Sequence, residues 1–533
     1  MKRRTILSNL GLLGAVGLAG CSGSSEGPGS GSSQSSGSGS SVSSGSEIRV
    51  GLSAGPTELN PMFMTKGVEY VYSSLAYSAL YRLGPDMSIV PDLATEAESN
   101  DDLTAWTLTL REDATFNKID QTVTAEDVQA TFEKMDDPDT GAAGMDEFGG
   151  IESVEAVDDF RVTFNLQNPT ANYPAYLSRG FGNVLPKQVI EDDFESISNE
   201  DYGSGPFNIV DYQTGETFEM EANDEYYLTD DSGNSLPLLD TVYLDVLPDA
   251  NSRTTAIQNG SIDIIYTAPP GQMDRLESIS SVNALSQPGG SYYSITMDAQ
   301  TEPFGDNRVR QAIKYAIDKE AILSNVGKGR GVLGQDNPIG PASNNYADLP
   351  QMYGPGQKLE EANALMEEAG YGDGIELEFP LHAPPVRPQI PQTAVLVQEY
   401  LSDIGIEVEI ERTPWETFLS QVEAQEPFYV VYYFMNPTVY NTMSVVSLPG
   451  GAYYGINWEN QEFRDALRGA KAAEDDEERA ELYMEAQRLM QEQGPFIVPY
   501  FENRLGAVRQ SVNNYNHHVG GQEIFLEEVT VSN

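Results

Sequence analysis

The segment Ser22–Ser46 limits where this chain can fold, because 21 of its 25 residues are Ser or Gly. A segment of this composition buries too little apolar surface to offset the entropy that ordering costs, so we expect a flexible tether. Folded structure is therefore expected only in Glu47–Asn533. At roughly 100–200 residues per domain, that length predicts two to four domains.

The first 21 residues, "MKRRTILSNLGLLGAVGLAGC", have the layout of an export signal. A basic start precedes the weakly apolar stretch Ile6–Gly20, whose 15 residues are fewer than the roughly 20 that span a bilayer. The pair Arg3-Arg4 resembles a twin-arginine signal, and "LAGC" resembles a lipobox, in which the cysteine thiol is lipidated. Cys21 is the only cysteine, so we expect a lipid anchor there and a domain held at the outer face of the cell membrane.

The charge balance excludes a main role in nucleic-acid binding, which requires a basic face. The chain has 82 Asp and Glu against 30 Lys and Arg, a net charge of −52, and the acidic residues are spread along its length. Such a charge destabilises a compact state by self-repulsion unless salt screens it. The pattern predicts a protein adapted to molar salt, where the Debye length is about 3 Å. The alternative, a cation-binding role, would need clustered ligands, and no D-x-D-x-D-G loop occurs.

Hydrophobic periodicity predicts a mixed α/β protein, with helix-then-strand units concentrated after Tyr292. Alternating apolar residues predict strands at Trp106–Leu110, Val162–Leu166 and Ile406–Ile410. Helical spacing predicts helices that start after Thr124 and near Asp306, that cover Leu359–Ala369 and Asp476–Gln493, and one that ends at Gly405. No repeat of fixed period is visible.

Motif searches do not indicate an enzyme. "GSSEG" matches G-x-S-x-G but lies in the tether, and "GRGVLG" matches G-x-G-x-x-G but follows a predicted helix, so we expect a loop there. His382, His517 and His518 are the only histidines, too few for a zinc site or a serine–histidine pair to be indicated. A carboxylate pair stays open among 82 acidic residues, although nothing singles one out. We therefore expect no catalysis, no cofactor and no metal.

Seven blocks, taken together and in order, resemble one family, the extracytoplasmic solute-binding proteins of peptide-type ABC importers. The first two blocks are "DLATEAESNDDLTAWTLTLREDATFNKIDQTVTAEDV" and "GSGPFNIVDYQTGETFEMEANDEYY". The others are "LDTVYLDVLPDANSRTTAIQNGSIDI", "FGDNRVRQAIKYAIDKEAI", "EANALMEEAGY", "VQEYLSDIGIEVEIE" and "EERAELYMEAQRLMQEQGPFIVPYF". The resemblance covers nearly all of Glu47–Asn533.

The resemblance implies an α/β, two-lobed fold similar to periplasmic binding proteins, of type II and the large three-subdomain variety, with a hinge between the lobes. Lobe I would comprise residues 47–288, with an inserted subdomain near 81–200, and the return segment 500–533; lobe II would comprise residues 289–499. A solute would be clamped between the lobes and passed to ABC permease subunits with their ATPase. The resemblance implies a monomer without a cofactor.

The resemblance also points to a ligand-contacting stretch, "VVYYFMNPTVYN". Peptide-binding relatives carry a tryptophan here and an aspartate that pairs with the peptide's amino group; Tyr433 and Asn436 stand at about those positions. Asparagine is neutral and forms no ion pair, although it offers a donor and an acceptor. This departure puts an amine-bearing peptide in doubt and leaves a neutral oligosaccharide open, since nearby aromatic rings could stack on sugars.

Eight residues are expected to contact the solute: Ser53, Ala54, Gly55, Tyr293, Trp415, Tyr433, Phe434 and Asn436. For the aromatic residues near Tyr433, the alternative is a place in the hydrophobic core. For Ser53, Ala54 and Gly55, the alternative is a plain turn. For Tyr293, the alternative is packing at the hinge. A nickel-binding relative is a minor alternative, because histidines are few. A secreted hydrolase is a further alternative function and would need catalytic residues that the motif searches did not find. A structural surface protein would be expected to show repeats.

Overall fold

The computed structural model describes residues 46–64, 67–142, 144–145, 148–178, 182–212 and 217–532, which belong to one unit, Gly45–Asn533. The expected signal segment, the lipid site at Cys21 and the Ser/Gly tether up to residue 45 lie outside these residues. Within the described ranges, no helix combines the length and apolar character that crossing a membrane requires.

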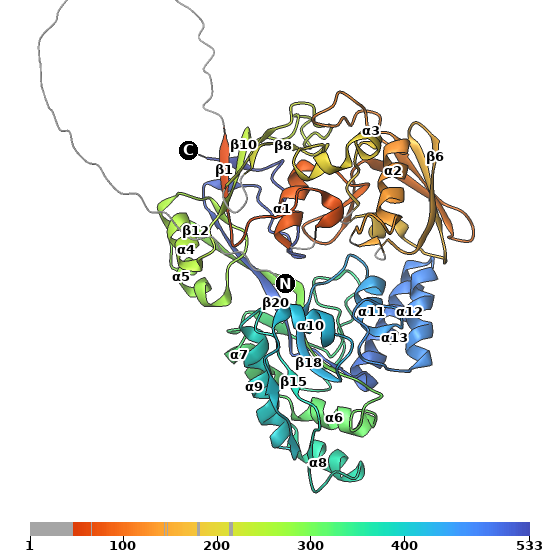
Figure 1. Ribbon diagram of the computed structural model, residues 1–533. Coiled ribbons are helices and arrows are strands. Elements are labelled where there is room, and N and C mark those ends of the chain that lie inside the picture. Colours follow the sequence, from red (N-terminus) through yellow and green to blue (C-terminus); the bar gives the residue numbers. More distant parts are fainter. Residues whose placement is uncertain are drawn as a thin grey trace, which may run out of the picture. The chain divides into compact units, whose positions relative to one another are not determined.

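Twelve strands of the described residues form one sheet, which organises the fold (Figure 1). Ten follow one another in the order β17 (Ile410–Glu411), β15 (Leu381–His382), β18 (Phe428–Tyr433), β12 (Val282–Met297), β20 (Tyr500–Arg509), β11 (Ile264–Ile265), β1 (Glu47–Leu52), β10 (Thr241–Val246), β9 (Phe218–Ala222) and β8 (Phe207–Tyr212). The other two are β13 (Gly331–Leu333), paired with β20, and β19 (Phe496–Ile497), paired with β12.

The two long strands β12 and β20 are the centre of this sheet. They pair antiparallel from Val282 opposite Arg509 to Pro288 opposite Asn503, and the register then shifts before Tyr292. Beyond the shift, β12 pairs with β18. The glycine that follows Pro288 fits the shift, because a Cβ at Gly289 would lie 2.6 Å from the backbone oxygen of Glu502. The two strands therefore run continuously from one group of hydrophobic cores into another.

The first group contains core A, which draws on residues between Ile48 and Tyr266 and again on Val508–Val529. It includes α1 (Gly67–Ala76), α2 (Ala125–Asp136) and the four-stranded sheet of β4 (Ala94–Ser99), β5 (Ala105–Leu110), β7 (Arg161–Leu166) and β6 (Ile151–Asp158). Phe132 of α2 packs edge-on against Phe164 of β7, with ring centroids 5.0 Å apart. The predicted strands at 106–110 and 162–166 and the helix after Thr124 are thus confirmed.

Beside core A lies the smaller core D, around α4 (Ala250–Asn259), α5 (Met273–Glu277) and β11. The remaining elements of this part and of the chain's end are β2 (Tyr81–Leu83), β3 (Ile89–Pro91), α3 (Lys187–Asp192), β21 (Val512–Asn513) and β22 (Thr530–Val531).

The second group consists of cores B and C, on opposite faces of β18. Alternate residues of β18 enter different cores: Phe428 and Val430 enter core B, whereas Tyr429 and Val431 enter core C, as the two-residue period of a strand requires. Core B is covered by α6 (Asn307–Ala316), α7 (Lys319–Asn325), α8 (Leu359–Glu368) and α9 (Gln389–Ser402). Core C is covered by α10 (Trp415–Gln421), α11 (Val439–Ser447), α12 (Gln461–Ala472) and α13 (Asp476–Gln493) (Figure 1).

Two predictions in this part need correction. The strand predicted at Ile406–Ile410 is interrupted: β16 (Ile406–Glu407) pairs with β14 (Ile375–Glu376), whereas β17 pairs with β15. Between them, the Val408 carbonyl accepts a hydrogen bond from the Gln398 side chain. The segment "GRGVLG", expected to be a loop, contains the short strand β13, because the edge of β20 offers it backbone partners. The segment does follow a helix, α7, as predicted.

The "GSGPF" motif places its two glycines against the end of α1. The Gly205 amide donates to the Ala76 carbonyl at 2.9 Å, and a Cβ at Gly205 would lie 2.6 Å from the Leu75 carbonyl oxygen. A Cβ at Gly203 would overlap the Ala76 carbonyl oxygen itself. Glycine is therefore required by close backbone approach at both positions.

We expect Gly203→Ala to lower the free energy of unfolding by about 3 kcal/mol or more, because two backbone segments must separate. Chemical denaturation of the full-length chain measures this loss. Gly271→Ala is the matched control, since no atom lies within 4 Å of its added Cβ. Equal stability of the two variants would contradict the close approach.

Candidate functional site

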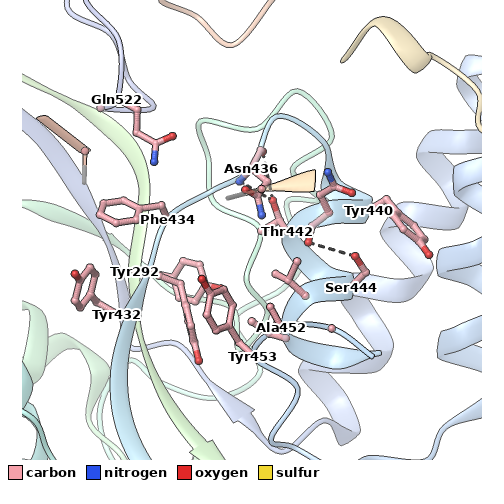
Figure 2. A pocket seen from close by; sticks show the side chains of 18 of the residues that line it. Tyr292, Tyr432, Phe434, Asn436, Tyr440, Thr442, Ser444, Ala452, Tyr453 and Gln522 are labelled. Carbon is pink, nitrogen blue, oxygen red and sulfur yellow. Dashed lines mark hydrogen bonds between the residues drawn. The ribbon is translucent and has the colours of Figure 1, made fainter. Parts of the chain in front are cut away.

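A cavity of about 1530 Å³ lies among loops and helix ends that belong to both groups of cores. The core A group contributes lining residues from the loop after β1, from α1 and from the segments that flank β6 and β7, including Ser53, Tyr70, Gly149, Gly150 and Asn168. The core B and C group contributes the end of β18, α10, α11 and α12. Figure 2 shows Tyr432 of β18 and Tyr440 of α11 in this wall. Residues far apart in the sequence therefore share this cavity.

Five of the eight predicted contact residues line the cavity: Ser53, Trp415, Tyr433, Phe434 and Asn436. Ala54 and Gly55 do not line it, although they follow Ser53 directly. Tyr293 does not line it either; its ring is fully buried in core B, and its hydroxyl donates to Glu502 at 2.9 Å. Its place behind the cavity wall arises because Tyr292 and Tyr293 point to opposite faces of β12, and Tyr292 takes the cavity side.

Aromatic rings form much of one wall (Figure 2). Trp415 stacks on Tyr432 with centroids 5.8 Å apart, and Tyr432 meets Phe434 edge-on at 5.5 Å. Tyr433 is a residue of core C that packs between the rings of Tyr292 and Tyr453, so it is both core and wall. Phe434 is 37% exposed, unusual for so large an apolar side chain, which leaves its ring available to a solute.

Asn436 lies just beyond β18, where the chain turns into α11. Its backbone amide donates to the Thr442 hydroxyl at 3.0 Å, and that hydroxyl also contacts the Asn436 carbonyl at 3.3 Å (Figure 2). The hydroxyl of a helix residue thus holds the backbone of Asn436 at the cavity wall. The side chain there is an amide, and it adds no charge to the site.

Arg387 is a cavity residue that sequence reasoning missed. Its guanidinium lies over the Tyr432 ring, 4.0 Å from the centroid, and its Nη1 is 3.1 Å from a Glu502 carboxylate oxygen. The Tyr293 hydroxyl bonds the other oxygen of Glu502, so Tyr293 positions Arg387 through that carboxylate. The sequence signal that could have pointed to Arg387 was its position as a lone basic residue in "PPVRP", in a chain that has few cations.

Three more cations line the cavity: Arg468 and Lys471 on α12, and Arg504 on β20. The Arg504 guanidinium lies over the Tyr266 ring at 4.3 Å and donates to the Thr267 hydroxyl at 2.9 Å. The sequence offered only a weak signal for the α12 pair, two scarce cations three residues apart, and no helix was predicted there.

Only two carboxylates, Glu416 and Glu423, occur among the described residues that line the cavity. Glu416 is exposed, whereas Glu423 is 8% exposed and accepts a hydrogen bond from the Tyr433 hydroxyl at 3.0 Å. Burial disfavours the charged carboxylate and raises the pKa of Glu423 from 4.5 to about 7. Near neutral pH the cavity therefore holds an excess of positive charge.

We expect Glu423→Gln to stabilise the chain at high pH and to have little effect at low pH. Because the Glu423 pKa is higher in the folded than in the unfolded chain, the folded chain binds more protons between pH 4.5 and about 7, and stability falls as the pH rises through that window. The gain at about pH 8 is on the order of 3 kcal/mol. Denaturant titrations between about pH 5 and pH 8 measure it.

Glu416→Gln is the matched control, an exposed carboxylate on the same cavity. A difference in unfolding free energy between Glu423→Gln and the unaltered chain that stays constant with pH would show that Glu423 does not titrate in this range.

Comparison with known proteins gives consistent matches. The family model "Bacterial extracellular solute-binding proteins, family 5 Middle" matches residues 88–451. The "Dipeptide-binding protein" of Escherichia coli K12 is 27% identical over 493 residues, covering 86% of this chain and 90% of the relative. The "Oligopeptide-binding protein AppA" of Bacillus subtilis is 26% identical over 545 residues, covering 97% of each.

The fold has a solved counterpart in HbpA2 from Haemophilus parasuis, with a TM-score of 0.80 at 22% identity, over 91% of this chain and 100% of that one. This likeness confirms the predicted fold class, an α/β, two-lobed fold of the type II periplasmic binding proteins.

Proposed function

Because this chain belongs to the family 5 bacterial extracellular solute-binding proteins, as its sequence resemblance predicted, we propose that it is the solute receptor of an ABC importer. It binds a peptide outside the cytoplasm and delivers it to the permease subunits and their ATPase. The observation that carries this proposal is the cavity of about 1530 Å³ with walls from both groups of cores. The function is binding and delivery, without catalysis or a cofactor.

The proposed mechanism is closure of two lobes over the solute, with residues 47–288 and 500–533 as lobe I and 289–499 as lobe II. The register shift between Pro288 and Tyr292 is the proposed hinge, since pairing is interrupted there in both long strands. Contacts across the lobes are both polar and apolar: Asn344 Nδ2 donates to the Met87 carbonyl at 3.0 Å, and Met435 packs in a small cluster with Leu83 and Met87. A solute that touches both walls stabilises the closed state by its higher affinity for that state.

A peptide is supported by the printed names of the two relatives and by Arg387. A guanidinium has five N–H donors, and the contact with Glu502 engages Nη1, so Arg387 can also bind a carboxylate from the cavity side. An oligosaccharide is the alternative, supported by the aromatic wall and by the neutral Asn436. The same binding experiment separates the two.

We expect peptides to raise the melting temperature of the full-length chain, measured in molar KCl because of its net charge of −52. A ligand at 100 times its Kd adds about 2.7 kcal/mol to stability. Arg387→Gln should weaken peptide binding about tenfold or more, by loss of a charge-assisted contact. Arg412→Gln, an exposed arginine outside the cavity lining, is the matched control.

A shift by neutral oligosaccharides alone would replace the peptide with a sugar as cargo. If neither class of compound shifts the melting temperature, the proposal of a peptide or sugar receptor fails.

We also propose that the chain is anchored through lipid on Cys21 and acts as a monomer. With a reach of about 5–6 Å × √n, the Ser/Gly tether would hold the folded part roughly 25–30 Å from the membrane. Cys21→Ser should move the chain from the membrane fraction of expressing cells to a soluble fraction, whereas Ser25→Ala should leave it with the membrane. Immunoblots of the two fractions measure this. Retention of Cys21→Ser on the membrane would refute the lipid anchor.

A further inference from the structure

The cavity reverses the charge balance of the chain. Its described lining contains four cations, Arg387, Arg468, Lys471 and Arg504, and two carboxylates, whereas the whole chain has 30 cations and 82 acidic residues. The burial that keeps Glu423 close to neutral increases the positive excess. A cavity with an excess of positive charge attracts an anion and disfavours a cation, although the acidic surface around it repels anions.

Arg468 and Lys471 form a pair of like charges one turn apart on α12. The Lys471 amino group donates to the Gly149 carbonyl at 3.0 Å and lies 4.8 Å from the Tyr440 ring centroid. The Arg468 side chain is exposed at the same part of the cavity lining. Among the described residues, no carboxylate forms an ion pair with either of them.

This arrangement costs free energy while no anion is bound. Like charges three residues apart on a helix repel each other. Lys471 is in addition partly desolvated, and this burial lowers its pKa to about 8. An anion held between the two side chains would remove the repulsion and form charge-assisted hydrogen bonds with both.

The pair lies away from Arg387 in the cavity. Arg387 lies over Tyr432 and near Phe434, whereas Lys471 lies beside Tyr440. Figure 2 shows Tyr432 and Phe434 at one side of the cavity and Tyr440 at the other, on α11. Two separate positions for anionic groups are therefore present, one at each side.

We propose that the solute carries anionic groups at both ends, and that Arg468 and Lys471 bind the group that Arg387 does not reach. This inference rests on the proposed function and names the charge class of its cargo, an acidic peptide or an acidic saccharide. The absence of a carboxylate at Asn436 fits such a solute, which needs no partner for a free amine.

The test is calorimetric titration of the full-length chain at one KCl concentration with two peptides of the same shape. Both peptides are N-acetylated, so that Glu-Ala-Ala-Ala has an anionic group at both ends and Gln-Ala-Ala-Ala has one only at its C-terminus. We expect the first to bind about tenfold more tightly, the effect of one charge-assisted contact. Digalacturonic acid and maltose form the corresponding saccharide pair, anionic and neutral.

Arg468→Gln should weaken Glu-Ala-Ala-Ala about tenfold and leave Gln-Ala-Ala-Ala unchanged, and Arg468→Lys should keep most of the preference. Arg412→Gln, a charge loss outside the cavity, should change neither. Lys471 is left intact, because its amino group also bonds Gly149.

Equal affinity for the two peptides, or an equal loss for both in Arg468→Gln, would overturn this inference while peptide binding itself stands. Binding of digalacturonic acid but of neither peptide, with the same sensitivity to Arg468→Gln, would support the anionic cargo and remove the peptide from the proposed function. If none of the four compounds binds, both proposals fall.

Discussion

The pairing of β12 with β20 is the constraint on which the rest of the structure depends. These strands contact β11 at one end and β18, β19 and β13 at the other, so every core of the sheet is tied to the same two strands. The register shift after Pro288 lets one strand serve both groups of cores without a break in the chain. Because the cavity walls come from both groups, their spacing depends on this crossing.

Charge divides the molecule into two environments. The surface carries most of the 82 acidic residues, which repel one another unless salt screens them, whereas the cavity gathers four cations beside aromatic rings. Aromatic faces attract cations, so Tyr432, Tyr440 and Tyr266 each hold one of them in place. The same side chains that could stack on a solute therefore also position the charges that would select it.

Several local elements could be predicted because their signals are local. The apolar spacing after Thr124 and the alternation at 106–110 each place one face in core A, and burial confirms both. The strand predicted at 406–410 was wrong in its continuity, because its partners, β14 and β15, come from elsewhere in the chain. Periodicity reports which side of an element is buried, but not which neighbour pairs with it.

By itself, the sequence determined the acidic character and, through seven ordered blocks, the family, and it predicted an export signal and a flexible Ser/Gly tether. Only the tertiary structure decided which side chains share the cavity. Tyr293 and Tyr433 look alike in the sequence, yet one lies behind the wall and the other on it. Arg387 and Lys471 lie far apart along the chain, and a cavity's charge is the sum of contributions from such distant segments, which no local pattern encodes.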